Sequence, residues 1–190
     1  PMALNLGLSG QPFTGPDIGG FAEDGPAGAT AAERGTHFAR WMGVGALLPF
    51  SRAHTNKGNG DKEPWAFGPE VERTCRTAIE RRYRLMPYLY TLFREASVTG
   101  MPVVRPVFFA DPRDPALRSE DRAFLLGGDL LVACQVAPKR APSAVIPAGW
   151  VKCRLPGETG DDSDLPELYL RPGAVVPVGP VMQYVDERPL

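Results

Sequence analysis

The sequence predicts an α/β segment followed by an all-β segment. Up to about residue 100, two short extended runs alternate with two long runs of helical periodicity. Beyond residue 100, short β-type runs are separated by clusters of Pro, Gly and Asp. Of the 190 residues, 43% are hydrophobic, which is enough for a folded core. Strands alternating with helices and then strands alone indicate part of an α/β domain joined to part of a β-sandwich.

Composition excludes several classes of partner. The 21 Lys and Arg residues nearly balance the 22 Asp and Glu residues, and no basic block resembles a nucleic-acid-binding surface. No run of 18 apolar residues exists, so we expect no membrane span. The three cysteines lack the spacing of a zinc site and are predicted to be free thiols. Free thiols favour a reducing compartment such as the cytosol or a plastid, and the compartment otherwise stays open.

The first strand and the first helix are predicted between residues 10 and 45. Pro and Gly residues at 10–16 lead the chain in an extended conformation into Asp17. Residues 22–32 are rich in Ala and Gly and predict a loop. A helix follows over 30–44, because Thr30 and Glu33 have the spacing of a capping box and apolar residues recur at helical intervals. Gly45 ends this helix.

The second strand and the second helix are predicted between residues 46 and 100. The apolar run at 46–50 predicts a buried strand that leads into the polar residues 51–54. Residues 55–64 are polar and predict a loop. Helical periodicity then extends from Pro69 to about Val98, with Gly100 as its end. Pro87 lies inside this pattern and is expected to kink the helix or divide it in two.

The last part of the chain predicts short strands. They are expected at 102–109, 123–126, 129–136, 143–147, 168–171 and 174–178, with an all-β module starting near residue 120. The acidic run at 161–164 lacks the glycine and the final glutamate of a calcium-binding EF-hand loop. We therefore interpret this run as a solvated turn.

Asp17 and His54 are the strongest candidates for a small-molecule site, because each follows an apolar run and enters a polar or Gly-rich loop. A carboxylate accepts hydrogen bonds from two hydroxyl groups, although Asp17 in a loop could instead brace the backbone. Phe21 could line the pocket or fill the core beneath the loop. Arg52 could bind the ligand, pair with a catalytic carboxylate or brace Asp17. Gly19 and Gly20 are interpreted as backbone requirements of the turn.

Several segments, in order along the chain, carry a resemblance to a known family. They are GQPFTGPDIGGF at 10–21, RW at 40–41, PFSRAH at 49–54, EPW at 63–65, RYRLMPYLY at 82–90, PVVRP at 102–106, GGDLLVA at 127–133 and LRPGAVVP at 170–177. Together they resemble glycoside hydrolase family 31, the α-glucosidases and their relatives. Each segment alone is weak, but their common order over roughly residues 5–180 makes the resemblance specific.

The resemblance implies a fold and a division of labour. Residues 1–119 would be the last two β/α units of a (β/α)8 TIM barrel, strands seven and eight with the helices that follow them, and residues 120–190 an incomplete proximal C-terminal β-sandwich. Asp17, His54, Phe21 and Arg52 would bind the sugar at the carboxyl ends of the strands. The nucleophile and the acid/base of a retaining hydrolase would lie in earlier segments that this chain does not contain. No catalytic residue, metal or organic cofactor is therefore assigned here.

The expected activity is that of a larger α-glucosidase, which hydrolyses terminal α-linked glucose from oligosaccharides or glucans. The 190-residue chain alone is expected to be inactive, because two strands cannot close a barrel and the missing part would be needed for folding. A relative that acts on another sugar, such as an α-xylosidase, or a transglycosylase is the alternative within the family. A non-catalytic remnant that binds carbohydrate or another partner is the alternative outside it.

Overall fold

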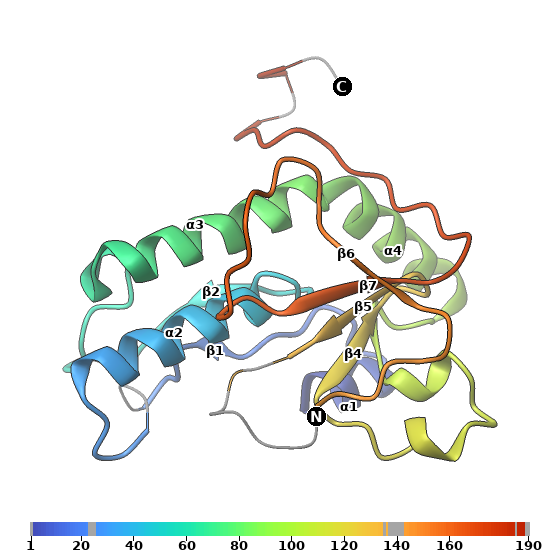
Figure 1. Cartoon of the computed structure of the whole chain (residues 1–190), viewed down its shortest axis with the longest axis horizontal. Helices are drawn as coiled ribbons and strands as arrows, with labels where there is room; N and C mark the ends of the chain where they lie inside the picture. The colour runs from blue at the N-terminus through green and yellow to red at the C-terminus, as the bar shows by residue number, and fades with distance from the viewer. Residues whose placement is uncertain (1, 23–25, 135, 137–142, 185, 189–190) are drawn as a thin grey trace.

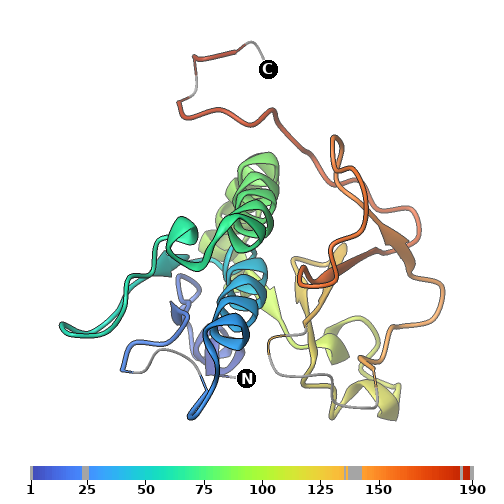
Figure 2. The ribbon, with the colours of Figure 1, turned by 60° about the vertical axis from the view of Figure 1, so that its left-hand side comes forward.

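The computed structural model describes residues 2–22, 26–134, 136, 143–184 and 186–188. The described chain has two halves, which Figure 2 shows side by side: helices with a short parallel strand pair, and an antiparallel sheet. The helices are α1 (Met2–Leu8), α2 (Ala31–Gly45), α3 (Pro69–Arg84) and α4 (Met86–Thr99), with 3-10 turns η1 (Pro64–Phe67), η2 (Val107–Phe109) and η3 (Pro115–Leu117). The strands are β1 (Asp17–Ile18), β2 (Arg52–Ala53), β3 (Val104–Arg105), β4 (Ala123–Leu126), β5 (Leu130–Ala133), β6 (Val151–Cys153) and β7 (Glu167–Leu170).

The helical predictions are confirmed. Helix α2 begins with the predicted capping box, in which the Thr30 hydroxyl accepts from the Glu33 amide and the Glu33 carboxylate accepts from the Thr30 amide. The long periodic run is divided at Leu85 into α3 and α4, and Pro87 lies in the first turn of α4. Helices α3 and α4 run end to end across the molecule (Figure 1). Gly100, with φ of 75°, caps α4 in the left-handed conformation.

The buried strand predicted at 46–50 is wrong. These residues are buried but form turns, and the strand β2 begins only at Arg52. Their carbonyl groups face the guanidinium of Arg82 on α3, which donates to the oxygens of Ala46, Leu48 and Pro49 at 2.9, 2.6 and 2.9 Å. Burial lowers the pKa of Arg82. A side chain from a distant helix thus satisfies carbonyls that a neighbouring strand would otherwise pair.

The two short strands of the helical half are parallel neighbours. Asp17 lies opposite Arg52 and Ile18 opposite Ala53. Helix α2 connects β1 to the turns before β2, and α3 packs beside α2 (Figures 1 and 2). A buried cluster joins Ile18 to Phe38 and Met42 of α2 and to Cys75 and Ala78 of α3. This packing fixes the carboxyl ends of both strands at one edge of the helical half.

The five-stranded antiparallel sheet has the order β3-β4-β5-β7-β6. Residues of β4 and β5 are buried on both faces, as their continuous apolar sequence indicates. One face, with Leu126 and Leu130, packs against α4, whereas the other, with Leu125 and Leu131, packs against the η2 and η3 segment. The predicted β-domain is thus observed as one sheet in the described residues, whereas its sandwich form and the boundary near residue 120 stay predictions.

Several strand predictions need correction. Residues 143–147 and 174–178 form no strand, and the expected run at 102–109 is a strand only at β3 before it turns into η2. The amide of Val145 donates to the Glu120 carboxylate instead of to a strand. β6 was not predicted, because its pairing with β7 depends on a partner that is distant in sequence. Gln135, within the predicted run 129–136, lies outside the described residues.

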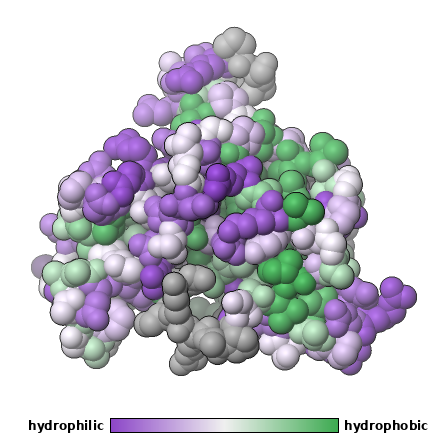
Figure 3. Space-filling view, viewed as in Figure 1, coloured by the Kyte–Doolittle hydropathy of each residue, from purple (hydrophilic) through white to green (hydrophobic). Residues whose placement is uncertain are grey.

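Polar contacts join the two halves. Arg81 of α3 forms a buried ion pair with Glu158, with 2.7 Å between Nε and Oε1, and also donates to the Pro166 carbonyl. The acidic run contributes too, because Asp162 accepts from Thr74 and Asp164 pairs with Arg40. Asp162 and Asp164 thus contact α3 and α2, so the prediction of a solvated turn is wrong for these two residues. In Figure 3, hydrophobic side chains gather mainly where α4 and the sheet lie.

Among the helices of the described residues, none has the length and apolar character needed to span a bilayer. In the same part of the chain, His, Cys, Asp and Glu side chains form no group of three that could hold a metal ion.

Candidate functional site

Strand register brings Asp17 and Arg52 together. They occupy opposite positions of the parallel pair, so their side chains project on the same face. Arg52 Nη2 and Nε lie 2.6 and 2.8 Å from Oδ1 of Asp17. Asp17 has 18% of its side chain exposed and Arg52 49%. A charge-assisted bond of this kind orients the carboxylate. Arg52 therefore braces Asp17, which is one of the three roles considered for it from the sequence.

In the part of the chain that the structure describes, the two oxygens of the Asp17 carboxylate differ in their contacts. Both Arg52 contacts go to Oδ1, and no described residue donates a hydrogen bond to Oδ2. An ionised carboxylate can accept several hydrogen bonds at once. A carboxylate that is held at one oxygen and receives no bond from the described residues at the other is suited to accept a bond from a ligand hydroxyl.

Two glycines turn the chain immediately after Asp17. Gly19 and Gly20 have φ of 83° and 87°, values that L side chains rarely adopt, and the Gly20 amide donates to the Asp17 carbonyl at 3.0 Å. A Cβ on Gly19 would lie 2.7 Å from the ring of Phe38. Their interpretation as backbone requirements is consistent with this geometry. We refer to residues 17–21 as the 17–21 turn.

Phe21 and His54 form the second half of the candidate site. Their rings stack with centroids 5.5 Å apart and planes at 26°. Phe21 is 48% exposed, and His54, directly after β2, is also exposed. Phe21 therefore does not fill the core beneath the loop. The pair presents an aromatic surface and a ring nitrogen near the ends of both strands.

The loop after β2 holds Phe21 from the other side. The Phe21 carbonyl accepts from the Asn56 amide at 2.9 Å, from Asn59 Nδ2 at 3.0 Å and from the Thr55 hydroxyl at 3.3 Å. Lys62, which is buried, donates from Nζ to the Gly19 carbonyl at 3.3 Å. The composition of residues 55–64 predicts only a polar loop. Its dense Asn, Thr and Gly content signals turns, but no spacing in the sequence indicates these long-range contacts.

His37 lies on α2 outside this site. Its ring meets the Trp41 ring edge-on at 5.3 Å. Burial lowers the pKa of His37, a backbone hydrogen bond with Val136 opposes that shift, and the nearby charges of Lys62 and Arg40 lower it further. The contact with Trp41 therefore assigns the His37 ring to packing on α2.

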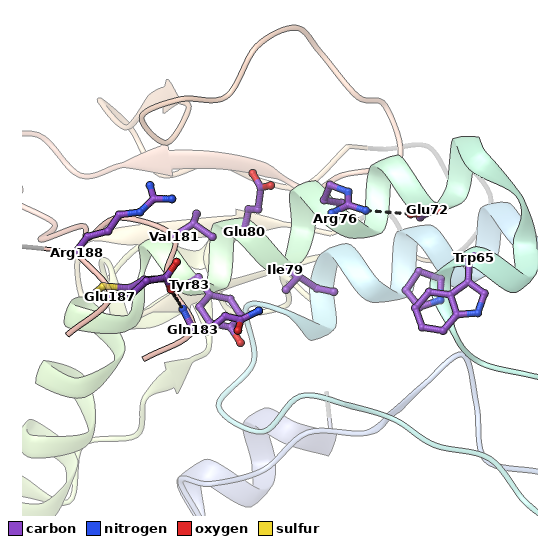
Figure 4. Close-up of a pocket in the computed structure, with 12 residues that line it drawn as sticks. Trp65, Glu72, Arg76, Ile79, Glu80, Tyr83, Val181, Gln183, Glu187 and Arg188 are labelled. Carbon is purple, nitrogen blue, oxygen red and sulfur yellow. Dashed lines mark hydrogen bonds and ion pairs between the residues drawn. The ribbon is translucent and has the colours of Figure 1, made fainter. Parts of the chain in front are cut away.

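A separate groove of about 500 Å³ lies between α3 and the C-terminal segment. Figure 4 shows Trp65 and Ile79 on its helical side, and Val181 and Gln183 on the C-terminal segment. Charged residues of α3, including Glu72 and its ion-pair partner Arg76, border the groove. None of the four predicted site residues lines it. The groove and the candidate site are thus different surfaces.

Comparison with family models identifies the family to which this chain belongs. Residues 1–92 match the glycosyl hydrolases family 31 TIM-barrel domain, and residues 100–176 match the glycosyl hydrolase family 31 C-terminal domain. The chain belongs to glycosyl hydrolase family 31. The resemblance recognised in the ordered motifs is therefore confirmed.

Individual relatives agree with the family 31 assignment. Alpha-glucosidase 2 of Bacillus thermoamyloliquefaciens is 38% identical over 98% of this chain and 24% of its own length. The solved family 31 alpha-glucosidase of Bacteroides thetaiotaomicron superposes with a TM-score of 0.81 at 44% identity, over 98% of this chain and 29% of that one. The alpha-xylosidase of Xanthomonas citri gives a TM-score of 0.80 at 29% identity, over 97% of this chain and 22% of that one. The chain thus spans about a quarter of the length of each of these three relatives.

Proposed function

We propose that this chain is the C-terminal part of a retaining α-glucosidase that removes terminal α-linked glucose from oligosaccharides or glucans. The observation that carries the proposal is the Asp17 carboxylate, which Arg52 holds at Oδ1 and which no described residue contacts with a hydrogen bond at Oδ2, near the stacked Phe21 and His54. Family 31 membership supports it, as do the relatives that are named alpha-glucosidases. The chain matches about a quarter of the length of those relatives, which supports its being part of a longer protein. Residues 1–119 would supply barrel strands seven and eight, and residues 120–190 the proximal β-domain.

In this proposal the four residues bind sugar and do not perform the chemistry. Asp17 accepts hydrogen bonds from ring hydroxyls, and His54 donates or accepts one further hydrogen bond with the sugar. Phe21 forms an apolar wall, and Arg52 positions Asp17. Retaining hydrolysis needs two carboxyl groups about 5–5.5 Å apart, a nucleophile and an acid/base. Asp17 is committed to Arg52 and to sugar binding, so both catalytic carboxylates would come from another part of the longer protein, which we call the intact protein.

The intact protein is expected to hydrolyse 4-nitrophenyl α-glucoside with retention of configuration, while the purified 190-residue chain gives no turnover. The reason is that the chain supplies binding groups without the catalytic pair. Product release followed by absorbance measures turnover, and NMR of the first-formed sugar measures configuration. Turnover by the isolated chain would contradict the division of labour. If the coding sequence upstream of Pro1 contains neither an Asp shortly before Pro1 nor a Trp-x-Asp segment farther upstream, a non-catalytic remnant is favoured.

An α-xylosidase is the second candidate, supported by the similarity to the alpha-xylosidase of Xanthomonas citri. Xylose lacks the exocyclic hydroxymethyl group of glucose. Parallel assays with 4-nitrophenyl α-xyloside therefore distinguish the two candidates through the ratio of kcat/KM. A ratio in favour of the xyloside would replace the glucosidase proposal.

Replacing Asp17 by Asn in the intact protein is expected to raise KM for the α-glucoside about 10- to 100-fold, because a hydrogen bond to a charged acceptor is lost. Arg52→Met should raise KM less, since the carboxylate remains but loses its brace. Steady-state kinetics and titration with glucose measure both effects. Asp121→Asn, an exposed acid outside the site, is the matched control. Wild-type glucose affinity in Asp17→Asn would remove Asp17 from the sugar site.

A further inference from the structure

Lys62 is a buried lysine beneath the candidate site. Only 7% of the residue is exposed. Its Nζ donates to the Gly19 carbonyl at 3.3 Å, and its Cδ lies 3.5 Å from where a Gly19 Cβ would be. Lysine is seldom buried unless its ammonium group has partners. The sequence separation of 43 residues makes this contact a link between the loop after β2 and the 17–21 turn.

The carbonyl that Lys62 holds lies at the middle of that turn. Gly19 and Gly20 lack side chains, so their peptide planes have more freedom than those of other residues. The turn's own bond, from the Gly20 amide to the Asp17 carbonyl, constrains one end. The Phe21 carbonyl is bound at the other end by residues of the loop after β2. The Gly19 carbonyl belongs to the same peptide unit as the Gly20 amide, so Lys62 and the turn's own bond hold opposite sides of that peptide.

We propose that Lys62 is a positioning residue of the sugar site: its ammonium group fixes the Gly19 carbonyl and thereby sets the relative placement of Asp17 and Phe21. The inference rests on the proposed sugar-binding function of those two residues. Lys62 itself does not contact the sugar. Its effect is to order the turn before the ligand arrives, so that binding does not carry the entropic cost of ordering two glycines.

The test compares Lys62→Met, Lys62→Arg and Lys57→Met in the intact protein. Methionine keeps the apolar stem that packs against the turn but removes the donor, and Lys57 is an exposed lysine of the same loop. For Lys62→Met we expect KM for 4-nitrophenyl α-glucoside and the inhibition constant of glucose to rise together about tenfold, with kcat nearly unchanged. Lys62→Arg should restore part of the affinity, and Lys57→Met should behave as wild type.

A double-mutant cycle with Asp17→Asn separates positioning from stability. If Lys62 acts through the turn, the losses of glucose affinity from Lys62→Met and Asp17→Asn will not add, because the second change removes a contact already impaired. Additive losses, or a lowered thermal midpoint with unchanged KM and glucose affinity, would overturn the inference. If Asp17→Asn loses affinity and Lys62→Met does not, this inference alone fails. If the wild-type protein neither binds glucose nor cleaves the glucoside, the proposed function fails with it.

Discussion

Replacing Glu158 by Ala is expected to lower the free energy of unfolding by about 3–5 kcal/mol. The side chains of Arg81 and Glu158 are only 9% and 5% exposed, and two hydrogen bonds join them, at 2.7 and 3.0 Å. Removing the carboxylate leaves a guanidinium that cannot lose its proton in a site with little water. The large effect comes from that uncompensated charge more than from the lost attraction between the partners.

Urea denaturation of the intact protein, followed by its tertiary circular dichroism signal, measures this loss. The control is Glu70→Ala, because Glu70 pairs with Arg73 on the exposed side of α3 and its loss should leave the transition nearly unchanged. The double variant Arg81→Met with Glu158→Leu should recover most of the stability, since it removes both charges. A double variant as unstable as Glu158→Ala would instead assign the effect to packing.

Replacing Gly127 by Ala is expected to cost about 2–5 kcal/mol, from a strained backbone and from overpacking together. Gly127 follows β4 with φ of 65°, and a Cβ there would lie 2.3 Å from Tyr88 Oη and 2.5 Å from Leu92 Cδ2. The Tyr88 hydroxyl is buried and donates to the Leu126 carbonyl at 2.8 Å. Burial raises the pKa of Tyr88 to about 12, so its hydroxyl stays a donor at neutral pH.

Gly173→Ala provides the matched control for Gly127→Ala. Gly173 has a similar φ of 74°, but open space surrounds the position of its Cβ. Its replacement should therefore show the backbone strain alone, about 1–2 kcal/mol. The difference between the two variants in urea denaturation measures the collision with α4. Equal losses would show that α4 moves aside at little cost.

Elements whose signals are local were predictable from the sequence. The capping box of α2 and the break near Pro87 depend on residues within a few positions of one another. The apolar runs of β4 and β5 are buried on both faces, which needs only that each strand be apolar throughout. The ordered motifs likewise sufficed for the family, because their order is itself a property of the sequence.

Elements that depend on distant partners were not predictable. The run at 46–50 has the composition of a buried strand, but the guanidinium of Arg82 binds its carbonyls, so no ladder forms there. The sequence predicts that the acids at 162 and 164 are solvated, but in the structure they contact Thr74 and Arg40. In both cases a long-range polar contact outweighs the local preference.

The candidate site likewise combines features that the sequence predicts with features that only the tertiary structure shows. The sequence by itself determined the family, the residue types of the site and the turn that needs Gly19 and Gly20, since these follow from motif order and backbone sterics. Only the tertiary structure decided that Arg52 holds one oxygen of Asp17, that Phe21 stacks on His54 and that Lys62 lies beneath them. The physical reason is that ring contacts, hydrogen bonds and ion pairs between residues 33 to 43 positions apart depend on strand register and loop packing, which no local pattern encodes.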